Sequence, residues 1–348
     1  MRWRQLLRRY IRKVSENKIN SRTALTFSIL FLVLLAVMIL SLGVGAVQLT
    51  PNETVSALIN QAQKNSHRTI VWEFRFPRIL LVVLCGAALS AAGVGFQGLF
   101  RNPLADPYVV GASGGAALGA TLAVMVRFSL PNITIGIGAF FGSLLAVLVV
   151  FAISEYSNYG SIAGLLLAGS AMSAMLSAVV SLLLLLNDEV LHGVYAWLLG
   201  SFANSSWSEL GQTLWLAPPA ILCVFLMSRS LDALAAGEET AQSLGLDLRK
   251  ARLIIVISSS LATAAAVSVS GIIGFVGLIA PHLARMLVGA NHKSMLPIAM
   301  LLGSLLMLFA DDLARTLMAP VEIPVGIFTA LLGGPFFLYL MKKGEKRT

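Results

Sequence analysis

Residues 25–47 read LTFSILFLVLLAVMILSLGVGAV, a run of 23 residues without a charged side chain. An α-helix of about 20 apolar residues is long enough to cross the hydrocarbon core of a bilayer. The run is too long for the apolar region of a cleavable signal peptide. We therefore interpret it as a transmembrane helix, preceded by a basic stretch from Arg2 to Arg22.

Apolar blocks of this kind recur along the whole chain. Of the 348 residues 57% are hydrophobic and 12% are charged, whereas a soluble domain has about 25% charged residues. We predict an all-α, polytopic membrane protein. Its ten expected spans are 24–46, 79–100, 107–126, 133–153, 161–186, 209–228, 251–270, 275–289, 295–313 and 325–341. Counts of nine or eleven stay open, because 107–126 is rich in Gly and Ala and 275–289 is short and carries Pro281, His282 and Arg285.

The distribution of positive charge predicts the orientation. With ten spans, 19 of the 25 lysines and arginines fall on the side of the two termini and 6 on the other. Cytoplasmic loops carry the excess of Lys and Arg, so both termini are expected in the cytoplasm. We predict a basic tail (1–23) resting on anionic lipid headgroups, one transmembrane domain (24–342) with a cytoplasmic loop at 229–250, and a short cytoplasmic tail (343–348). The net charge of +9 is thus a topology signal, and no nucleic-acid partner is expected.

Motifs for covalent chemistry are missing from the sequence. Cys85 and Cys223 lie in apolar blocks without metal-ligand spacing, and the four histidines are scattered. The sequence has no GxxxxGK[ST], GxSxG or HExxH pattern. We expect no catalytic residue, metal site or cofactor, and any ATP hydrolysis would belong to a separate protein.

The spans are rich in small residues and poor in charge. Residues 86–93 read GAALSAAG and residues 111–120 read GASGGAALGA. Small side chains let helix backbones approach closely inside a membrane, which predicts a tightly packed bundle. Ion-coupled carriers usually need ionisable groups at mid-depth. The nearest candidates, Asp311 and Asp312, are interpreted as lying at a solvated helix end.

A proline-rich string joins the second and third spans. Within residues 97–107, QGLFRNPLADP, the turn consists of Arg101, Asn102, Pro103, Asp106 and Pro107. Asp is a favoured helix N-cap, and proline is tolerated in the first helical turn. The string therefore predicts a sharp cytoplasmic turn that ends one helix and starts the next.

The inner loop contains a second informative string, GEETAQSLG at 237–245. It predicts a short amphipathic helix with Glu238 and Glu239 in its first turn, ended by Gly245. Asp247 is expected to cap the following helix. Such a helix suits docking into a partner's groove, although an ordinary surface loop is the alternative.

Three arginines on the opposite side run against the topology bias: Arg75, Arg78 and Arg315. Arginine pairs bidentately with carboxylates. A positive rim of this kind could dock an acidic protein surface or an anionic ligand. Contacts with lipid headgroups or helix capping are the alternatives.

Five strings together resemble the permease subunits of ABC importers for ferric siderophores, haem and cobalamin, the FecCD-like family. They are RFPR at 75–78, GLFRNPLADP at 98–107, SLG at 243–245, GFVGLIAPHLAR at 274–285 and EIPVGIFTALLGGPFF at 322–337. The basic stretch before residue 24 lies outside the resemblance.

The resemblance implies the type II ABC importer permease fold with ten spans per subunit. It also implies a second permease subunit, the same or homologous, a cytoplasmic ABC ATPase dimer and an external substrate-binding protein. By the same resemblance, Arg75, Arg78 and Arg315 match positions that salt-bridge glutamates of the binding protein. The residues matching the helices that couple to the ATPase are Glu238, Glu239, Ala241, Ser243, Leu244 and Gly245.

The leading hypothesis is therefore a permease that translocates a ferric siderophore across the cytoplasmic membrane. Haem and cobalamin are rival substrates, because selection would rest mainly with the binding protein. The span 161–186, which the family uses to line its path, has few polar groups and does not separate them. An ion-coupled secondary carrier is a remoter alternative.

Overall fold

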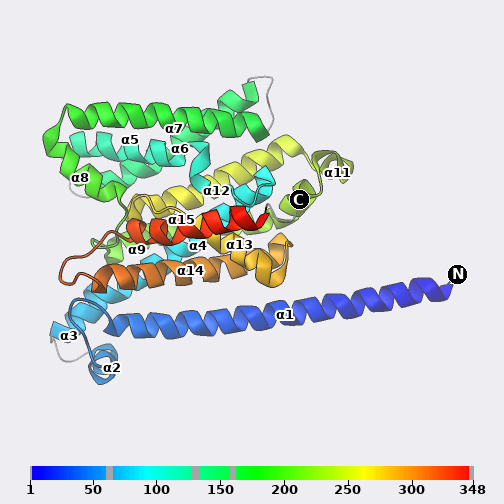
Figure 1. Ribbon diagram of the computed structural model, residues 1–348, viewed down its shortest axis with the longest axis horizontal. Coiled ribbons are helices and arrows are strands. Elements are labelled where there is room, and N and C mark those ends of the chain that lie inside the picture. The colour runs from blue at the N-terminus through cyan, green and yellow to red at the C-terminus, as the bar shows by residue number, and fades with distance from the viewer. Residues whose placement is uncertain (1, 60–65, 127–132, 157–161, 345–348) are drawn as a thin grey trace.

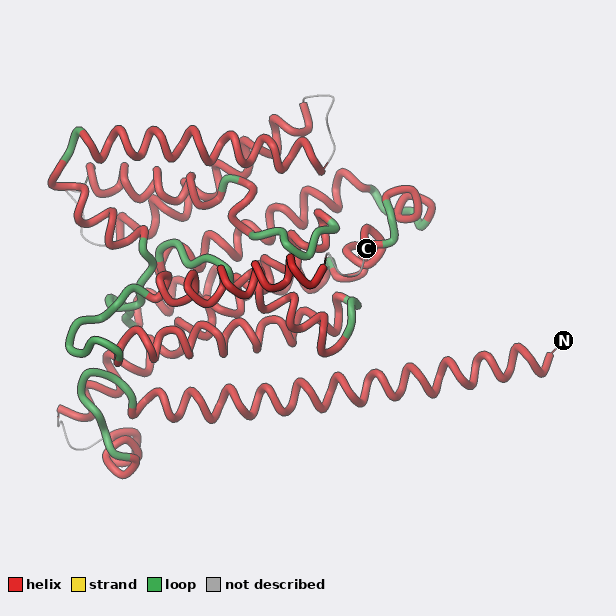
Figure 2. The backbone as a smooth tube through the Cα atoms, in the orientation of Figure 1, coloured by secondary structure: helices red, strands yellow, loops and turns green. Residues whose placement is uncertain are grey.

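The computed structural model describes residues 2–59, 66–126, 133–156 and 162–344, and in these ranges all regular elements are helices (Figures 1 and 2). The first half of the chain forms α1 (Arg2–Gly43), α2 (Pro51–Ile59), α3 (Ser66–Thr69), the π-helical turn η1 (Ile70–Arg75), α4 (Phe76–Phe100), the 3-10 turn η2 (Pro107–Val110), α5 (Ala112–Met125), α6 (Ile133–Tyr156) and α7 (Ile162–Leu185). The second half forms α8 (Asp188–Leu198), α9 (Trp207–Leu226), α10 (Ser228–Ala235), α11 (Glu238–Ser243), α12 (Leu248–Ser270), α13 (Val276–Val288), α14 (His292–Thr316) and α15 (Val325–Gly344).

Each of the ten expected spans coincides with an apolar helix. Seven described helical segments are long and apolar enough to cross a membrane, and three shorter apolar helices, Ala112–Met125, Val276–Val288 and Val325–Tyr339, match the remaining expected spans. The predicted all-helical, polytopic fold is confirmed. The third span begins later than expected, because Pro107–Val110 is a 3-10 turn and α5 starts only after Gly111, whose φ is +90°.

Three helical segments were not expected. Residues 47–78 fall between the first two expected spans, and 229–250 was expected to be a cytoplasmic loop. In the structure, Ser66–Arg75 runs continuously into α4, and Ser228–Ala235 forms α10. The helix α8 was also missed. Aromatic packing accounts for the extension of α4: the rings of Trp72 and Phe76 lie 5.2 Å apart, and those of Phe76 and Trp207 lie 5.7 Å apart.

Small residues let α4 occupy the centre of the bundle, where it packs against α9, α12, α13 and α14. A Cβ atom added to Gly93 would lie 1.9 Å from the carbonyl oxygen of Gly277, so only glycine permits this approach. The pair α5–α6 shows the same feature, because a Cβ on Gly119 would lie 2.0 Å from the carbonyl oxygen of Gly138. The expected close packing of backbones is confirmed.

The helices differ sharply in how much of their surface the chain itself covers. In an apolar 18-residue window of Ser66–Phe100, 83% of the residues are buried, against 17% in the corresponding windows of α1 and α7. Lipid or a partner protein must cover an apolar helix face that the chain leaves open. The helices α1 and α7 therefore have the most apolar surface available for contact with lipid or with a partner protein.

The bundle has two distinct ends (Figure 1). The α11 end carries α11 and the N-terminal end of α1, and α15 ends on the same side. The α2 end carries α2, α3 and α8. At the α2 end, Thr50 and Glu53 cap α2: the Thr50 backbone N–H donates to Glu53 Oε2 over 2.8 Å, which also lowers the pKa of Glu53.

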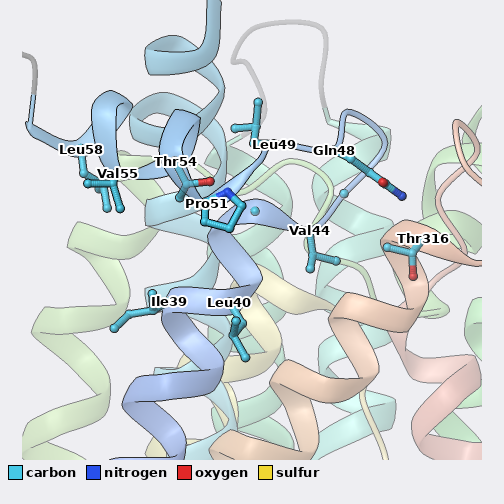
Figure 3. A pocket seen from close by; sticks show the side chains of 12 residues that line it. Ile39, Leu40, Val44, Gln48, Leu49, Pro51, Thr54, Val55, Leu58 and Thr316 are labelled. Atoms are coloured by element: carbon cyan, nitrogen blue, oxygen red, sulfur yellow. The ribbon is translucent and has the colours of Figure 1, made fainter.

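An apolar pocket of about 460 Å³ lies between α1 and α2 (Figure 3). Its walls include Leu40, Val44, Pro51, Val55 and Leu58.

Candidate functional site

Arg75, at the α2 end, is buried and holds the connection between α1 and α2. Its guanidinium donates to the carbonyl oxygen of Leu42 over 2.7 Å and also to that of Val47. Gly45 has a φ of +152°, and a Cβ there would lie 2.7 Å from Arg75 Nη2. The chain after α1 therefore wraps around this guanidinium, which satisfies backbone carbonyls that the end of α1 leaves free.

Arg78, one helical turn further, is buried between two carboxylates. Its Nη2 lies 2.8 Å from Asp311 Oδ1 and its Nη1 lies 2.8 Å from Glu322 Oε2. Asp311 is fully buried, and its carboxylate also contacts Arg315, with Arg315 Nε 3.1 Å from Asp311 Oδ2. The interpretation of Asp311 as a solvated helix end is therefore wrong: α4 and α14 pack side by side there, which places its carboxylate between two guanidinium groups.

Arg315 completes this cluster. It pairs with Asp312, and its Nη1 donates to the carbonyl oxygen of Val44 over 3.1 Å. Asp312 in turn accepts a hydrogen bond from the hydroxyl of Ser41 on α1. The side chains of α14 thus tie the end of α1 to the centre of the bundle.

The structure brings the three arginines together but does not expose them as a positive rim. Three guanidinium groups face three carboxylates, those of Asp311, Asp312 and Glu322, so the cluster is formally neutral. Arg75, Arg78 and Arg315 are each less than 8% exposed. They line a cavity of about 230 Å³ together with Glu322, the one ion-pair partner with substantial exposure. A docking partner would have to reach the arginines through this cavity.

At the opposite end, the predicted short helix is present as α11, Glu238–Ser243. Gly245 has a φ of +82°, and the N–H of Leu246 donates to the carbonyl oxygen of Ala241 over 3.0 Å, which ends the helix as expected. Asp247 caps α12, and the backbone N–H of Lys250 lowers the pKa of its carboxyl. The end of α11 and the start of α12 are therefore both set by residues close to them in the sequence.

The predicted coupling residues occupy different faces of α11. Ala241 is fully buried, Glu238 is half-buried, and Glu239 and Ser243 are exposed. Leu244 is 71% exposed. An exposed leucine beside a glycine turn is the kind of side chain that enters a groove on a partner protein.

Glu238 is also an ion-pair residue. Its Oε1 lies 2.7 Å from Arg101 Nη2, and its Oε2 lies 2.7 Å from Arg252 Nη2. The predicted turn and the predicted coupling helix are therefore in direct contact, although 137 residues separate Arg101 from Glu238.

The turn itself has the expected geometry. Arg101 is left-handed, with a φ of +51°, and ends α4. Asn102 Oδ1 accepts from the N–H of Leu104 over 2.9 Å, and Asp106 Oδ1 accepts from the N–H of Tyr108 over 2.9 Å. Pro107 is the first residue of the 3-10 turn, and Pro103 lies between the two side-chain caps.

The sequence analysis missed several partner residues. Glu322 lay inside a quoted string without a role, and Asp232 and His292 were not singled out. Asp232 Oδ1 lies 2.6 Å from His292 Nδ1 and accepts from the backbone N–H of His292 over 3.0 Å. No short-range pattern could have joined them, because 60 residues separate the pair.

No group of three His, Cys, Asp or Glu side chains comes together as metal ligands would in the described parts of the chain.

The apolar helices of the described residues are those of a multi-pass membrane protein. The chain belongs to the FecCD transport family, which it matches over residues 32–343. It is thus an ABC importer permease, a type of subunit that is not itself an enzyme and that implies ATPase and substrate-binding partners.

Characterised relatives match almost end to end. The hemin transport system permease protein HmuU of Yersinia pestis is 41% identical over 338 residues, which cover 95% of this chain and 99% of that protein. The molybdate import system permease protein MolB of Haemophilus influenzae is 39% identical, over 90% and 95% of the two chains. The Fe(3+)-citrate import system permease protein YfmE of Bacillus subtilis is 36% identical, over 93% and 96%.

A solved structure has the same fold. It is an inward-facing conformation of a protein described as a metal-chelate type ABC transporter. The match has a TM-score of 0.78 and 36% sequence identity, and it covers 91% of this chain and 98% of the chain in that structure.

Proposed function

We propose that the chain is the permease for a ferric siderophore, driven by an ABC ATPase dimer that engages α11. The observation that carries the proposal is the α11 segment: a short helix, ion-paired to two helix termini, that presents Leu244 to solvent. Relatives named for hemin and Fe(3+)-citrate support an iron chelate as the substrate class.

In this proposal the α11 end faces the cytoplasm and both termini lie there, as the excess of Lys and Arg on that side favours. The basic tail 1–23 lies within the described α1 from residue 2 onward and would rest on lipid headgroups. The C-terminal tail lies mostly outside the described residues. The domain limits, 24–342 with the coupling loop at 229–250, remain part of the proposal.

The α2 end then faces the substrate-binding protein. Glutamates of that protein would pair with Arg78 and Arg315 by exchanging with the permease's own carboxylates, which already pair with them. At Arg75 they would replace hydrogen bonds to the backbone carbonyls of Leu42 and Val47. A second permease subunit would cover the apolar face that α7 leaves open. ATP-driven movement of the ATPases would displace α11 and tilt the helices between outward- and inward-open states.

Haem is the second candidate substrate, because the hemin permease of Yersinia pestis matches 95% of the chain. Reconstitution of the permease with its ATPase and binding protein in proteoliposomes tests both. We expect ATP-dependent uptake of an iron-labelled siderophore, with hemin and cobalamin competing weakly. Preferential uptake of hemin would transfer the proposal to haem. Uptake driven by an ion gradient without the ATPase would refute it and favour a secondary carrier.

A further inference from the structure

Two carboxylates connect the α10–α11 segment to the rest of the bundle. The first, Glu238, divides its oxygens between Arg101 and Arg252, at 2.7 Å each. Arg101 is the residue that ends α4, and Arg252 lies in the first turns of α12. One carboxylate on α11 therefore holds the ends of two transmembrane helices.

The second carboxylate, Asp232 on α10, holds a third helix. It accepts the backbone N–H of His292, the first residue of α14, over 3.0 Å, and lies 2.6 Å from the ring Nδ1 of the same histidine. A carboxylate at a helix N-terminus is favoured by the free N–H groups and the helix dipole. His292 is 4% exposed and packs against α4, because a Cβ on Gly98 would lie 2.7 Å from its Nε2.

These contacts fix a helix that is too short to be stable alone. The six residues of α11 form little more than one turn, and isolated helices below about 12 residues are marginal in water. Burial of Ala241 holds one face of α11. Glu238 then fixes the position of α11 relative to α4 and α12, and Asp232 fixes the preceding helix α10 relative to α14.

We propose that Glu238 and Asp232 are positioning residues that transmit displacement of α11 to α4, α12 and α14. The inference rests on the proposed coupling role of α11. Charge-assisted hydrogen bonds are short and directional, which suits them to carrying displacement. The Glu238 and Arg101 side chains are 34% and 37% exposed, and pairs so open to water contribute little to stability. Loss of the Glu238 bridge should therefore appear in coupling rather than in folding.

The test is Glu238→Gln in the complete complex of permease, ATPase and binding protein in proteoliposomes. ATP hydrolysis and substrate uptake are measured on the same vesicles. We expect the complex to assemble and the substrate transported per ATP hydrolysed to fall severalfold, because displacement of α11 would no longer be carried to α4 and α12 through this bridge. Arg101→Gln breaks the same bridge from the other side and should give the same result.

A matched pair of variants distinguishes loss of the ion pair with Glu238 from loss of a positive charge near the start of α12. Arg252→Gln and Lys250→Gln remove the same charge near the start of α12, but Lys250 is 80% exposed and pairs with Asp247 on its own helix. We expect Arg252→Gln to uncouple and Lys250→Gln to transport as the wild type does.

Three results would decide against the inference or its premise. An unchanged transport ratio in Glu238→Gln and Arg101→Gln would overturn the positioning role while leaving the proposed function intact. Loss of ATPase binding in both variants would also overturn it, since Glu238 would then be a docking residue. Absence of ATP-driven uptake by the wild type would refute the proposed function itself.

Discussion

The two ends of the bundle use the same residue types at different depths. At the α2 end, Arg78 and Arg315 share the fully buried Asp311. At the α11 end, Arg101 and Arg252 share Glu238, which is 34% exposed. One carboxylate between two guanidinium groups is thus a buried junction in one place and a half-exposed one in the other.

The difference in burial predicts a difference in role. Removing one partner of a buried ion pair leaves a charge without compensation, whereas removing one partner of an exposed pair costs little. The α2 end should therefore tolerate little change without loss of the fold. The α11 end can be altered, and even displaced, while the bundle stays intact.

The largest effect is expected from Arg78→Glu, which places a third carboxylate beside Asp311 and Glu322. Breaking a buried pair costs about 3–5 kcal/mol, so we expect a large fall in the thermal unfolding temperature in detergent. Lys250→Glu is the control at the α11 end, and its effect should stay within about 0.5 kcal/mol. Similar unfolding temperatures for the two variants would remove the contrast between the ends.

This prediction also changes how the docking role must be tested. A charge reversal at Arg75 or Arg78 that abolishes uptake says nothing about docking unless the variant is still folded. Binding of the substrate-binding protein therefore has to be measured on variants whose unfolding temperature is unchanged.

A smaller loss is expected from Gly93→Ala, in the packed centre that joins the two ends. The added Cβ would lie 1.9 Å from the carbonyl oxygen of Gly277, and overpacking costs about 1–3 kcal/mol. Gly334→Ala is the matched control, because a Cβ there meets no atom within 4 Å. The measurement is the unfolding temperature of both variants, and equal values would show that the central helices are not in close contact.

The smallest effect on stability, with the largest on transport, is expected from Leu244→Asp. Its side chain is 71% exposed, so unfolding should shift by about 0.5 kcal/mol or less. We expect loss of ATPase co-purification or of ATP-driven uptake, because a charge would replace the apolar group offered to the partner. Normal co-purification together with normal uptake would count against the coupling role of α11.

Most of the fold could be predicted from the sequence, because apolar length and local capping are short-range signals. The ten apolar helices follow from length and composition. The ends of α11 and the start of α12 follow from Gly245 and Asp247, whose effects act within a few residues. The turn from Arg101 to Pro107 is predictable for the same reason.

The ion-pair junctions could not be predicted, because they are made between distant segments. Arg78 and Asp311 are 233 residues apart, and Arg101 and Glu238 are 137 apart. The sequence identified Arg75, Arg78, Arg101 and Arg315. It could not show that Arg78 and Arg315 already pair with carboxylates, or that Arg75 donates to backbone carbonyls. It also could not show that Ser66–Arg75 continues α4, since that depends on the packing of Trp72 and Phe76 against Trp207.

The most direct test of the account is the side of the membrane to which each end is exposed. Leu244→Cys at the α11 end and Val321→Cys at the α2 end each place a thiol at a site where the side chain is now 71% or 64% exposed. Cys85 is buried, and Cys223 is replaced by alanine in both variants to remove the half-buried thiol.

Both variants are labelled with a membrane-impermeant maleimide in oriented vesicles. We predict that Leu244→Cys reacts only in inside-out vesicles and is protected by the bound ATPase, and that Val321→Cys reacts only in right-side-out vesicles. Reaction of Leu244→Cys from the external side, or no protection by the ATPase, would contradict the assignment of α11 as the coupling helix.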